Sequence, residues 1–300
     1  MGSPLILEGS GIGKMEILEK AGIQLVHEIS GVGANYQDHA SHASPYIADP
    51  NTTTLDSLFC GEPETRRIAV EKWEKNASGL LSTNGIESAI QMRPLPHELV
   101  ELGPEFTEYW NEVLVNHSDR SLFWLSAAPF HPGIYTDLHL PNFMASAMIL
   151  GYPASRGYLH ISSADPYAAP DFNAGCLSDP VNVIALPWEY KKAHEIAWRL
   201  PAFCGALAPA HPNFAPGSPA AHFETTPVPL DVPKIIYSAE DDKAIDANVR
   251  QFVKTTWHWL GTCAMKPLEQ GGVVGSSFNV YGIKNLKVAD VSIPPSNVNT

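Results

Sequence analysis

Proline is spread along the whole sequence, and no other feature limits the possible folds more strongly. The 300 residues include 26 prolines, and eight of them fall within residues 201–233. A proline inside a helix removes a backbone hydrogen bond and clashes with the preceding turn. The pattern therefore argues against a pure helix bundle. It predicts a mixed chain in which helices alternate with strands and loops, with one long loop over 201–233.

The composition is that of a globular protein, and its net charge disfavours polyanionic partners. Hydrophobic residues make up 44% and charged residues 17%, which is enough apolar material for a buried core of one large domain or two smaller ones. The net charge of −13 argues against nucleic acid and against an anionic membrane surface as partners. No apolar run reaches the roughly 18 residues of a spanning helix. No histidines stand at HxxxH or HxH spacing, so we expect no metal site.

Short periodic segments predict where helices and strands alternate. We expect helices at 14–21, 64–78 and 181–200, the last of them started or interrupted at Pro187, and strands at 23–27, at 84–93 and at two places within 143–166. Residues 4–7 fit a short buried strand or the start of a helix, and residues 95–140 give little periodic signal.

The strongest helix signal begins at Ser238. Ser238 and Asp241 have the spacing of a capping box, and Glu240, Asp241 and Asp242 place negative charge at the positive end of the helix dipole. Apolar side chains then recur at helical spacing on one face: Ile245, Val249, Phe252 and Val253.

A glycine cluster near the N-terminus raises the question of a nucleotide-binding loop. Gly9 and Gly11 supply the first two glycines of a GxGxxG fingerprint, but Lys14 stands where the third is needed. Glu28 follows at about the position of a ribose-binding acid. The local residues leave two readings open, a nucleotide loop and a tight structural turn.

Several longer motifs resemble one family, the glucose–methanol–choline (GMC) oxidoreductases. The matching segments are SPLILEGSGIG at 3–13, GVGANYQDH at 31–39, WHWLGTCAM at 257–265 and the C-terminal block at 279–295, with a central strand region at 153–166. They occur in the family's order and leave only about 95–140 and 201–233 unsupported. Tyr36, residues 83–87 and residues 163–172 most resemble fungal alcohol oxidases.

The resemblance implies an α+β fold made of two parts. Residues 41–240 would form a substrate-binding domain with an antiparallel sheet of about six strands and helices on one side. Residues 1–40 and 241–300 would form the later segments of an α/β FAD-binding domain whose N-terminal Rossmann unit is missing. Cut edges would then expose apolar surface, so we expect low solubility or self-association.

The resemblance also names the residues of the site. His258 matches the histidine that acts as general base beside the flavin, and imidazole suits that role because its pKa lies near neutrality. Trp257, Asp290, Val291 and Asn35 match segments beside the cofactor, FAD. The family's second catalytic residue would fall one position past Thr300, so Asn297 is expected to be a turn residue.

The predicted function is FAD-dependent oxidation of a primary alcohol, by hydride transfer to flavin with oxygen as acceptor. The expected partners are a small-molecule alcohol and further copies of the chain in a homo-oligomer. The compartment stays open between peroxisome and cytoplasm. A second reading also stays open: a truncated or degenerate family member that binds no flavin and turns nothing over, because without a βαβ unit the diphosphate lacks its usual helix N-terminus.

Overall fold

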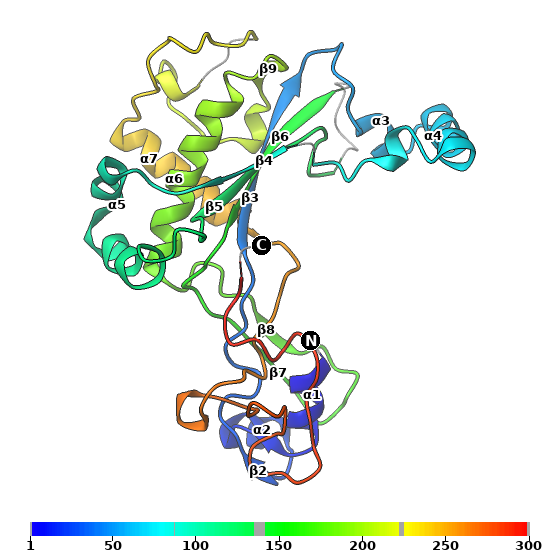
Figure 1. The fold of residues 1–300 in the computed structure, drawn as a ribbon, viewed down its shortest axis with the longest axis vertical. Helices are drawn as coiled ribbons and strands as arrows, with labels where there is room; N and C mark the ends of the chain where they lie inside the picture. Colours follow the sequence, from blue (N-terminus) through cyan, green and yellow to red (C-terminus); the bar gives the residue numbers. More distant parts are fainter. Residues whose placement is uncertain (1, 87, 135–141, 222–224, 299–300) are drawn as a thin grey trace.

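The computed structural model describes residues 2–86, 88–134, 142–221 and 225–298. The chain folds into two lobes joined by a narrow waist, with the larger lobe above the smaller one in Figure 1. The C-terminus lies near the waist and the N-terminus beside the smaller lobe. Among the described helices, none is both long enough and apolar enough to cross a membrane.

A six-stranded antiparallel sheet forms the centre of the larger lobe. Its strands are β3 (Ala40–Ala48), β4 (Ser88–Met92), β5 (Phe123–Ala128), β6 (Phe143–Leu150), β9 (Phe203–Ala206) and β10 (Lys254–Thr255). The order is β10-β3-β6-β5-β4, and β9 pairs with the far end of β3. Phe123 pairs with Leu150 and Leu125 with Met148, so these four side chains share one face of the pleat. All four belong to the main hydrophobic core.

Three helices cover that face: α5 (Pro96–Tyr109), α6 (Pro180–Ala197) and α7 (Ala239–Phe252). The capping box predicted for α7 is present, with Ser238 Oγ accepting from the Asp241 N–H and Asp241 accepting from the Ser238 N–H. The helix predicted at 181–200 is α6. It begins after the Asp179 cap with Pro180 in its first turn and continues through Pro187, so the predicted start or interruption there is wrong.

Tertiary packing explains the elements that the sequence did not reveal. The 201–233 segment is mostly loop, as predicted, but it also contains β9, which completes the sheet against β3. Residues 95–140 carry α5 and β5, and part of that segment lies outside the described residues. Helix α5 bends at Gly103, where φ is +84°, so its periodic signal is broken in two.

The smaller lobe brings the two ends of the chain together. It contains α1 (Gly2–Gly9), β1 (Ile12–Gly13), α2 (Met15–Ala21), β2 (His27–Glu28), β7 (Tyr158–His160) and β8 (Asp171–Asn173). Its core joins residues from both ends, among them Leu7, Ile29, Cys263, Val274 and Ile293. Residues 4–7 lie in helix α1, and of the strand predicted at 23–27 only His27 is extended.

The glycine cluster makes a tight turn between α1 and β1. At Gly11 φ is +80°, and a Cβ atom there would lie 2.5 Å from the carbonyl oxygen of Gln24. Glycine is therefore required by the close approach of two backbone segments. The geometry supports the structural reading of this cluster.

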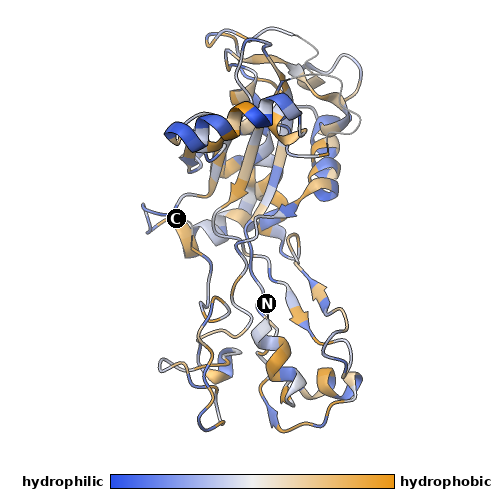
Figure 2. Cartoon of the chain, turned by 90° about the vertical axis from the view of Figure 1, so that its right-hand side faces the viewer, coloured by the Kyte–Doolittle hydropathy of each residue, from blue (hydrophilic) through white to orange (hydrophobic). Residues whose placement is uncertain are grey.

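A helical arm projects sideways from the sheet. It consists of α3 (Asp56–Phe59) and α4 (Pro63–Asn76), and α4 confirms the helix predicted at 64–78. Only Ala69 of α4 is buried. Figure 2 views the molecule from the side of this arm and shows hydrophilic residues over much of α4, which stands nearest the viewer.

Candidate active site

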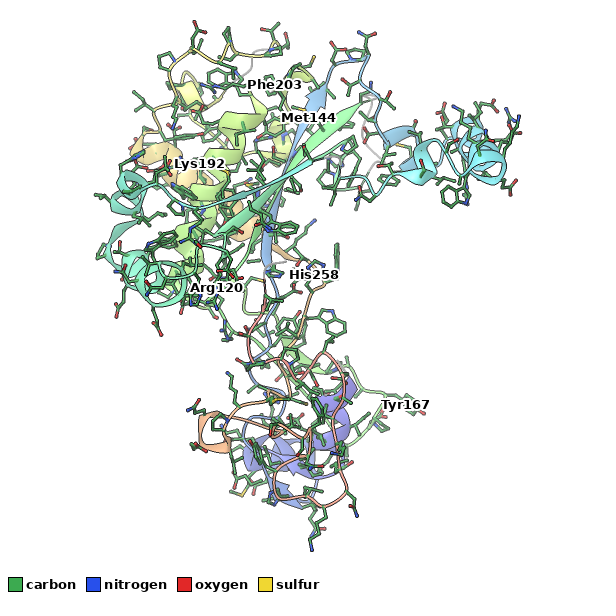
Figure 3. All side chains as sticks on the ribbon, viewed as in Figure 1. Arg120, Met144, Tyr167, Lys192, Phe203 and His258 are labelled. Atoms are coloured by element: carbon green, nitrogen blue, oxygen red, sulfur yellow. The ribbon has the colours of Figure 1, made fainter. Side chains whose placement is uncertain are left out.

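His258 lies in the waist, just beyond the end of strand β10 (Figure 3). Its neighbour Trp257 has φ of +62°, in the left-handed region that side chains other than glycine rarely adopt. Both side chains are exposed, and Trp257 is 80% exposed. A bulky residue held in this conformation with an exposed indole is typical of a functional turn.

The buried carboxylate of Asp38 holds this turn in place. Its Oδ1 accepts from the Thr256 N–H at 3.3 Å, the Thr256 hydroxyl at 3.0 Å and the His258 N–H at 3.1 Å. Its Oδ2 accepts from the Tyr36 hydroxyl at 3.3 Å. Asp38 is only 6% exposed, so the QDH motif fixes the backbone of His258 from across the chain.

The histidine of the QDH motif, His39, lies against the His258 ring. The rings of His39 and His258 meet edge to face with their centroids 5.8 Å apart, and His39 Nδ1 is 2.9 Å from the Leu150 carbonyl oxygen. Burial lowers the pKa of His39, and the nearby His258 adds to that effect, although the Leu150 contact opposes it. His258 therefore lies beside an imidazole that stays neutral near pH 7.

A cavity of about 360 Å³ opens at this histidine pair. Trp257, His258 and Val291 line it together with His39 and Asn297. The Asn297 N–H donates to Gln37 Oε1 at 3.2 Å, and its Nδ2 lies 3.4 Å from the His258 carbonyl oxygen. Asn297 lies outside any turn and makes long-range contacts instead, so the structure does not bear out the turn residue expected there.

Asp290 lines a neighbouring cavity of about 530 Å³ that shares Pro294 with the first. Asp290 accepts from the Ser292 N–H at 2.8 Å, from the Ser292 hydroxyl and from the Ser3 hydroxyl on α1. Desolvation opposes ionisation of Asp290, but these hydrogen bonds outweigh it and lower its pKa. The carboxylate is ionised and links the C-terminal block to the first helix.

Asn35 lines neither cavity and lies behind them. Its Nδ2 donates to the Gly261 carbonyl at 3.1 Å, and its Oδ1 accepts from Lys266 at 3.3 Å. Gly261 has φ of +91°, and a Cβ atom there would lie 2.6 Å from the Asn35 carbonyl oxygen. Of the residues predicted beside a cofactor, Trp257, Val291 and Asp290 therefore line the two cavities, whereas Asn35 contacts the backbone that supports them.

The residues around the two cavities fit a flavin dinucleotide. Trp257 and Val291, 80% and 55% exposed, present apolar surface at the His258 end. The backbone N–H groups of Asp290 and Val291 donate to no other residue in the described part of the chain, so they are available to oxygen atoms of a ligand. No group of three or more His, Cys, Asp or Glu side chains suited to a metal ion occurs among those same residues.

The sequence motifs did not reveal that Asp38 and His39 act on His258. Both lie in the QDH motif, and His39 is a structural neighbour of His258. The QDH motif was visible in the sequence, but the residue that Asp38 contacts, His258, lies 220 positions further along the chain. Only the three-dimensional contact assigns the role.

Comparison with known proteins gives one consistent result. Residues 153–300 match the family model described as GMC oxidoreductase. The chain is 35% identical to an alcohol oxidase of Pichia angusta over 341 aligned positions, and 34% identical to an alcohol oxidase of Candida boidinii over 342. These alignments cover 99% of this chain but 51% and 52% of the two relatives. The chain thus spans about half the length of the curated relatives it matches.

Solved structures agree on the fold. A formate oxidase superposes with a TM-score of 0.76 at 20% identity, covering 100% of this chain and 49% of the other. A fungal aryl-alcohol oxidase superposes with a TM-score of 0.67 at 22% identity, covering 99% of this chain and 49% of the other. The predicted α+β class with an antiparallel sheet is confirmed by these likenesses and by the sheet itself.

Proposed function

The chain belongs to the GMC oxidoreductases through residues 153–300, and we propose that it is the later portion of an FAD-dependent oxidoreductase that oxidises a small primary alcohol. The observation that carries the proposal is the histidine in the waist. His258 is exposed to a cavity, and its backbone is fixed by Asp38. Trp257 and Val291 line the same cavity.

Bound FAD would supply the hydride acceptor. An imidazole nitrogen of His258 would accept the hydroxyl proton of the alcohol while the hydride leaves the carbon. The neutral His39 ring beside it leaves His258 free to gain that proton without a fixed positive charge close by.

Four further residues would hold the cofactor and the turn. Trp257 and Val291 would contact the flavin ring of FAD. Asp290 and its backbone N–H would lie along the extended remainder of the cofactor. Asn35 would act indirectly, through the Gly261 backbone. Oxygen as final electron acceptor is part of the same proposal and is supported by the names of the alcohol oxidase relatives.

The proposal extends to the organisation of the whole protein. We infer that residues 1–40 and 241–300 belong to the FAD-binding domain and 41–240 to the substrate-binding domain, as the family resemblance implies. The two lobes divide the chain differently, since α7 packs against α6 in the larger lobe and β7 lies beside α1 in the smaller lobe. Exposed apolar side chains such as Ile6 and Val26 support a homo-oligomer.

The competing function is a family member without flavin binding or turnover. It is favoured by the glycine cluster at the N-terminal end, where Gly11 serves a tight backbone turn rather than a phosphate-binding loop. Flavin binding separates the two readings.

The test titrates the purified chain with FAD and follows flavin absorbance and fluorescence, then hydrogen peroxide release with methanol. His258→Ala is expected to bind FAD like the parent chain and to lose roughly 10²- to 10⁴-fold in turnover. His117→Ala, at an exposed histidine outside both cavities, is the matched control. A chain that binds no FAD would establish the competing function, and full turnover by His258→Ala would exclude His258 as base.

A further inference from the structure

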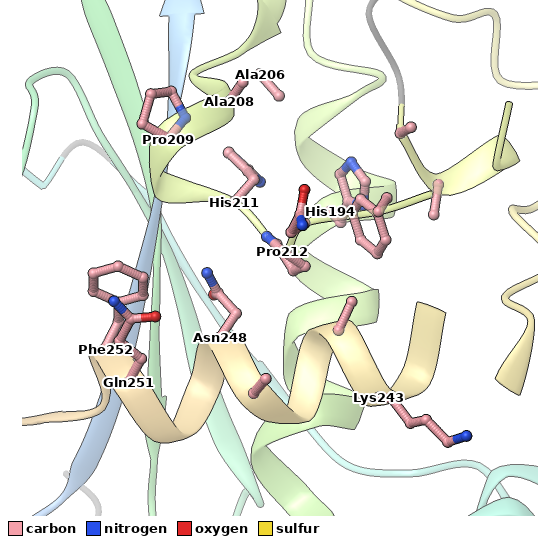
Figure 4. Close-up of a pocket in the computed structure, with 16 residues that line it drawn as sticks. His194, Ala206, Ala208, Pro209, His211, Pro212, Lys243, Asn248, Gln251 and Phe252 are labelled. Atoms are coloured by element: carbon pink, nitrogen blue, oxygen red, sulfur yellow. The ribbon is translucent and has the colours of Figure 1, made fainter. Parts of the chain in front are cut away.

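A separate cavity of about 600 Å³ lies on the helix side of the sheet, and it shares no lining residue with the cavities at His258 or Asp290. Helix α7 forms one wall and the segment 206–214 the other (Figure 4). Its size is that of a small-molecule site. The buried residues Asn248, His194 and His211 form the floor, whereas Lys243, Gln251 and Asn213 are exposed at the rim.

The face of α7 that lines this cavity has an unusual composition. Ala244, Ala247, Asn248 and Gln251 lie at i, i+3, i+4 and i+7 and all line the cavity. The other side of the helix packs Ile245 and Val249 into the main core. A helix face meant to close against a neighbour normally carries larger apolar side chains, so the alanines keep this space open and the two amides supply polar groups.

Asn248 is a buried residue that brings an unused amide donor to the floor. The residue is 6% exposed, and its Oδ1 lies 2.9 Å from His42 Nε2. Its Nδ2 donates to no residue in the described ranges of the chain. In Figure 4 the amide rises from α7 toward the segment that carries His211 and Pro212. This N–H group is therefore available to an acceptor on a ligand in the cavity.

The His211 ring on the floor is neutral at pH 7. His211 Nδ1 lies 3.0 Å from the Tyr190 hydroxyl and its Nε2 lies 2.7 Å from the Pro45 carbonyl oxygen, so both ring nitrogens are engaged. Burial lowers the pKa of His211, and likewise that of His42 behind Asn248, to about 4. Lys243 is the one Lys, Arg, Asp or Glu among the described residues that line the cavity, and it is exposed at the rim.

Flat aromatic surface completes the wall. The His194 and Phe214 rings stack at 6.2 Å with an angle of 6° between their planes, and Phe252 lines the far end. Carboxamides that both donate and accept suit hydroxyl groups, and aromatic faces suit the C–H face of a sugar or polyol. His211 and Asn248 offer an anion no positive charge, and a purely apolar molecule would make no use of the Asn248 amide.

We propose that this cavity binds a neutral polyhydroxylated small molecule, held by the amides of Asn248 and Gln251 and by the aromatic wall. The site is independent of the flavin chemistry proposed for His258. Its occupancy can be measured whether or not the chain binds FAD.

The test uses the full chain with sorbitol and glucose as probes and gluconate as the charged comparator, followed by saturation-transfer NMR and by titration. Ala247→Phe fills the cavity and is expected to abolish binding of both neutral probes. Ala239→Phe places the same side chain at an exposed position of α7 outside the cavity and is expected to leave binding unchanged.

Gln251→Ala removes a rim amide with little risk to folding and is expected to weaken binding several-fold. The inference is overturned if neither neutral probe binds saturably, if Ala247→Phe binds as well as Ala239→Phe, or if gluconate binds more tightly than sorbitol.

Discussion

Asp38 is the residue on which the geometry of the site depends most directly. One carboxylate oxygen accepts two backbone N–H groups and one hydroxyl from the turn that carries His258. Without it those groups lose their acceptor in a largely buried place, at a cost of roughly 1–3 kcal/mol for each unsatisfied group.

We therefore expect Asp38→Ala to lower both the free energy of unfolding and the turnover of the flavin-loaded chain. Asp38→Asn keeps an oxygen at Oδ1 and is expected to recover most of both quantities. Urea denaturation and peroxide release measure the two effects. Equal losses in the two variants would show that the carboxylate charge, rather than the hydrogen bonds, supports the turn.

Glu189 is a buried carboxyl with a different consequence. It is fully buried in α6, and neither side-chain oxygen has a hydrogen-bond partner within the described structure. Burial raises its pKa well above the ordinary value. The folded state therefore holds a proton that the unfolded chain releases above about pH 4.3, so this group destabilises the fold as the pH rises.

Replacing Glu189 by Gln or Met is expected to raise the free energy of unfolding at pH 8, and the gain should shrink as the pH falls towards 4.3. Urea midpoints at several pH values measure it. A gain independent of pH would mean that the carboxyl is not protonated in the folded state.

The buried histidines change the stability with pH in the opposite direction to Glu189, because burial lowers their pKa values. The pKa values of His42 and His211 are lowered to about 4 by burial, whereas an unfolded histidine titrates near 6.5. Between these values the unfolded chain binds more protons, so stability should fall as the pH drops from about 6.5 to 4, by up to roughly 3 kcal/mol for each histidine. His211→Gln should flatten that part of the pH profile, measured by urea unfolding, and an unchanged slope would refute the assignment.

At the level of elements, α7 depends on its cap. Ser238 and Asp241 satisfy each other's backbone N–H groups at the first turn. We expect Ser238→Ala to lower the free energy of unfolding by about 0.5–2 kcal/mol. Ser276→Ala, at an exposed serine outside any helix, serves as control in the same urea titration. A loss no larger than in that control would show that the cap is dispensable.

The same helix shows why some elements could be predicted from the sequence and others could not. Helix α7 has its start signal and its apolar face within 14 residues, so local pattern was sufficient. Strand β9 exists because β3 offers it an edge, and α6 continues through Pro187 because it packs on the sheet and on α5. For the site, motif resemblance predicted His258, Trp257 and Val291 at one cavity, whereas the roles of Asp38 and Asn35 depend on contacts between the two ends of the chain.

At the level of the whole molecule, large apolar side chains stand exposed on the smaller lobe and the waist. Ile6 is 70% exposed, Val26 68% and Trp257 80%. Exposed apolar side chains that gather on one surface mark contact surfaces. We expect the purified chain to associate with itself in a concentration-dependent way.

Sedimentation velocity over a range of concentrations measures that association. Ile6→Ser is expected to weaken it, whereas Ile236→Ser, at an equally exposed side chain outside the smaller lobe, should not. A monomer at every concentration would contradict the expectation.

The hydrogen bond from His258 to Asp38 joins positions 220 residues apart, and its neighbours in the waist are equally distant in sequence. Such pairings form slowly, because the intervening chain must be closed into a loop first. The turn at His258 should then be among the last parts to assemble during refolding. A chain cut between the two ends would carry every motif of the site on two fragments, without the continuous loop that brings Asp38 to His258.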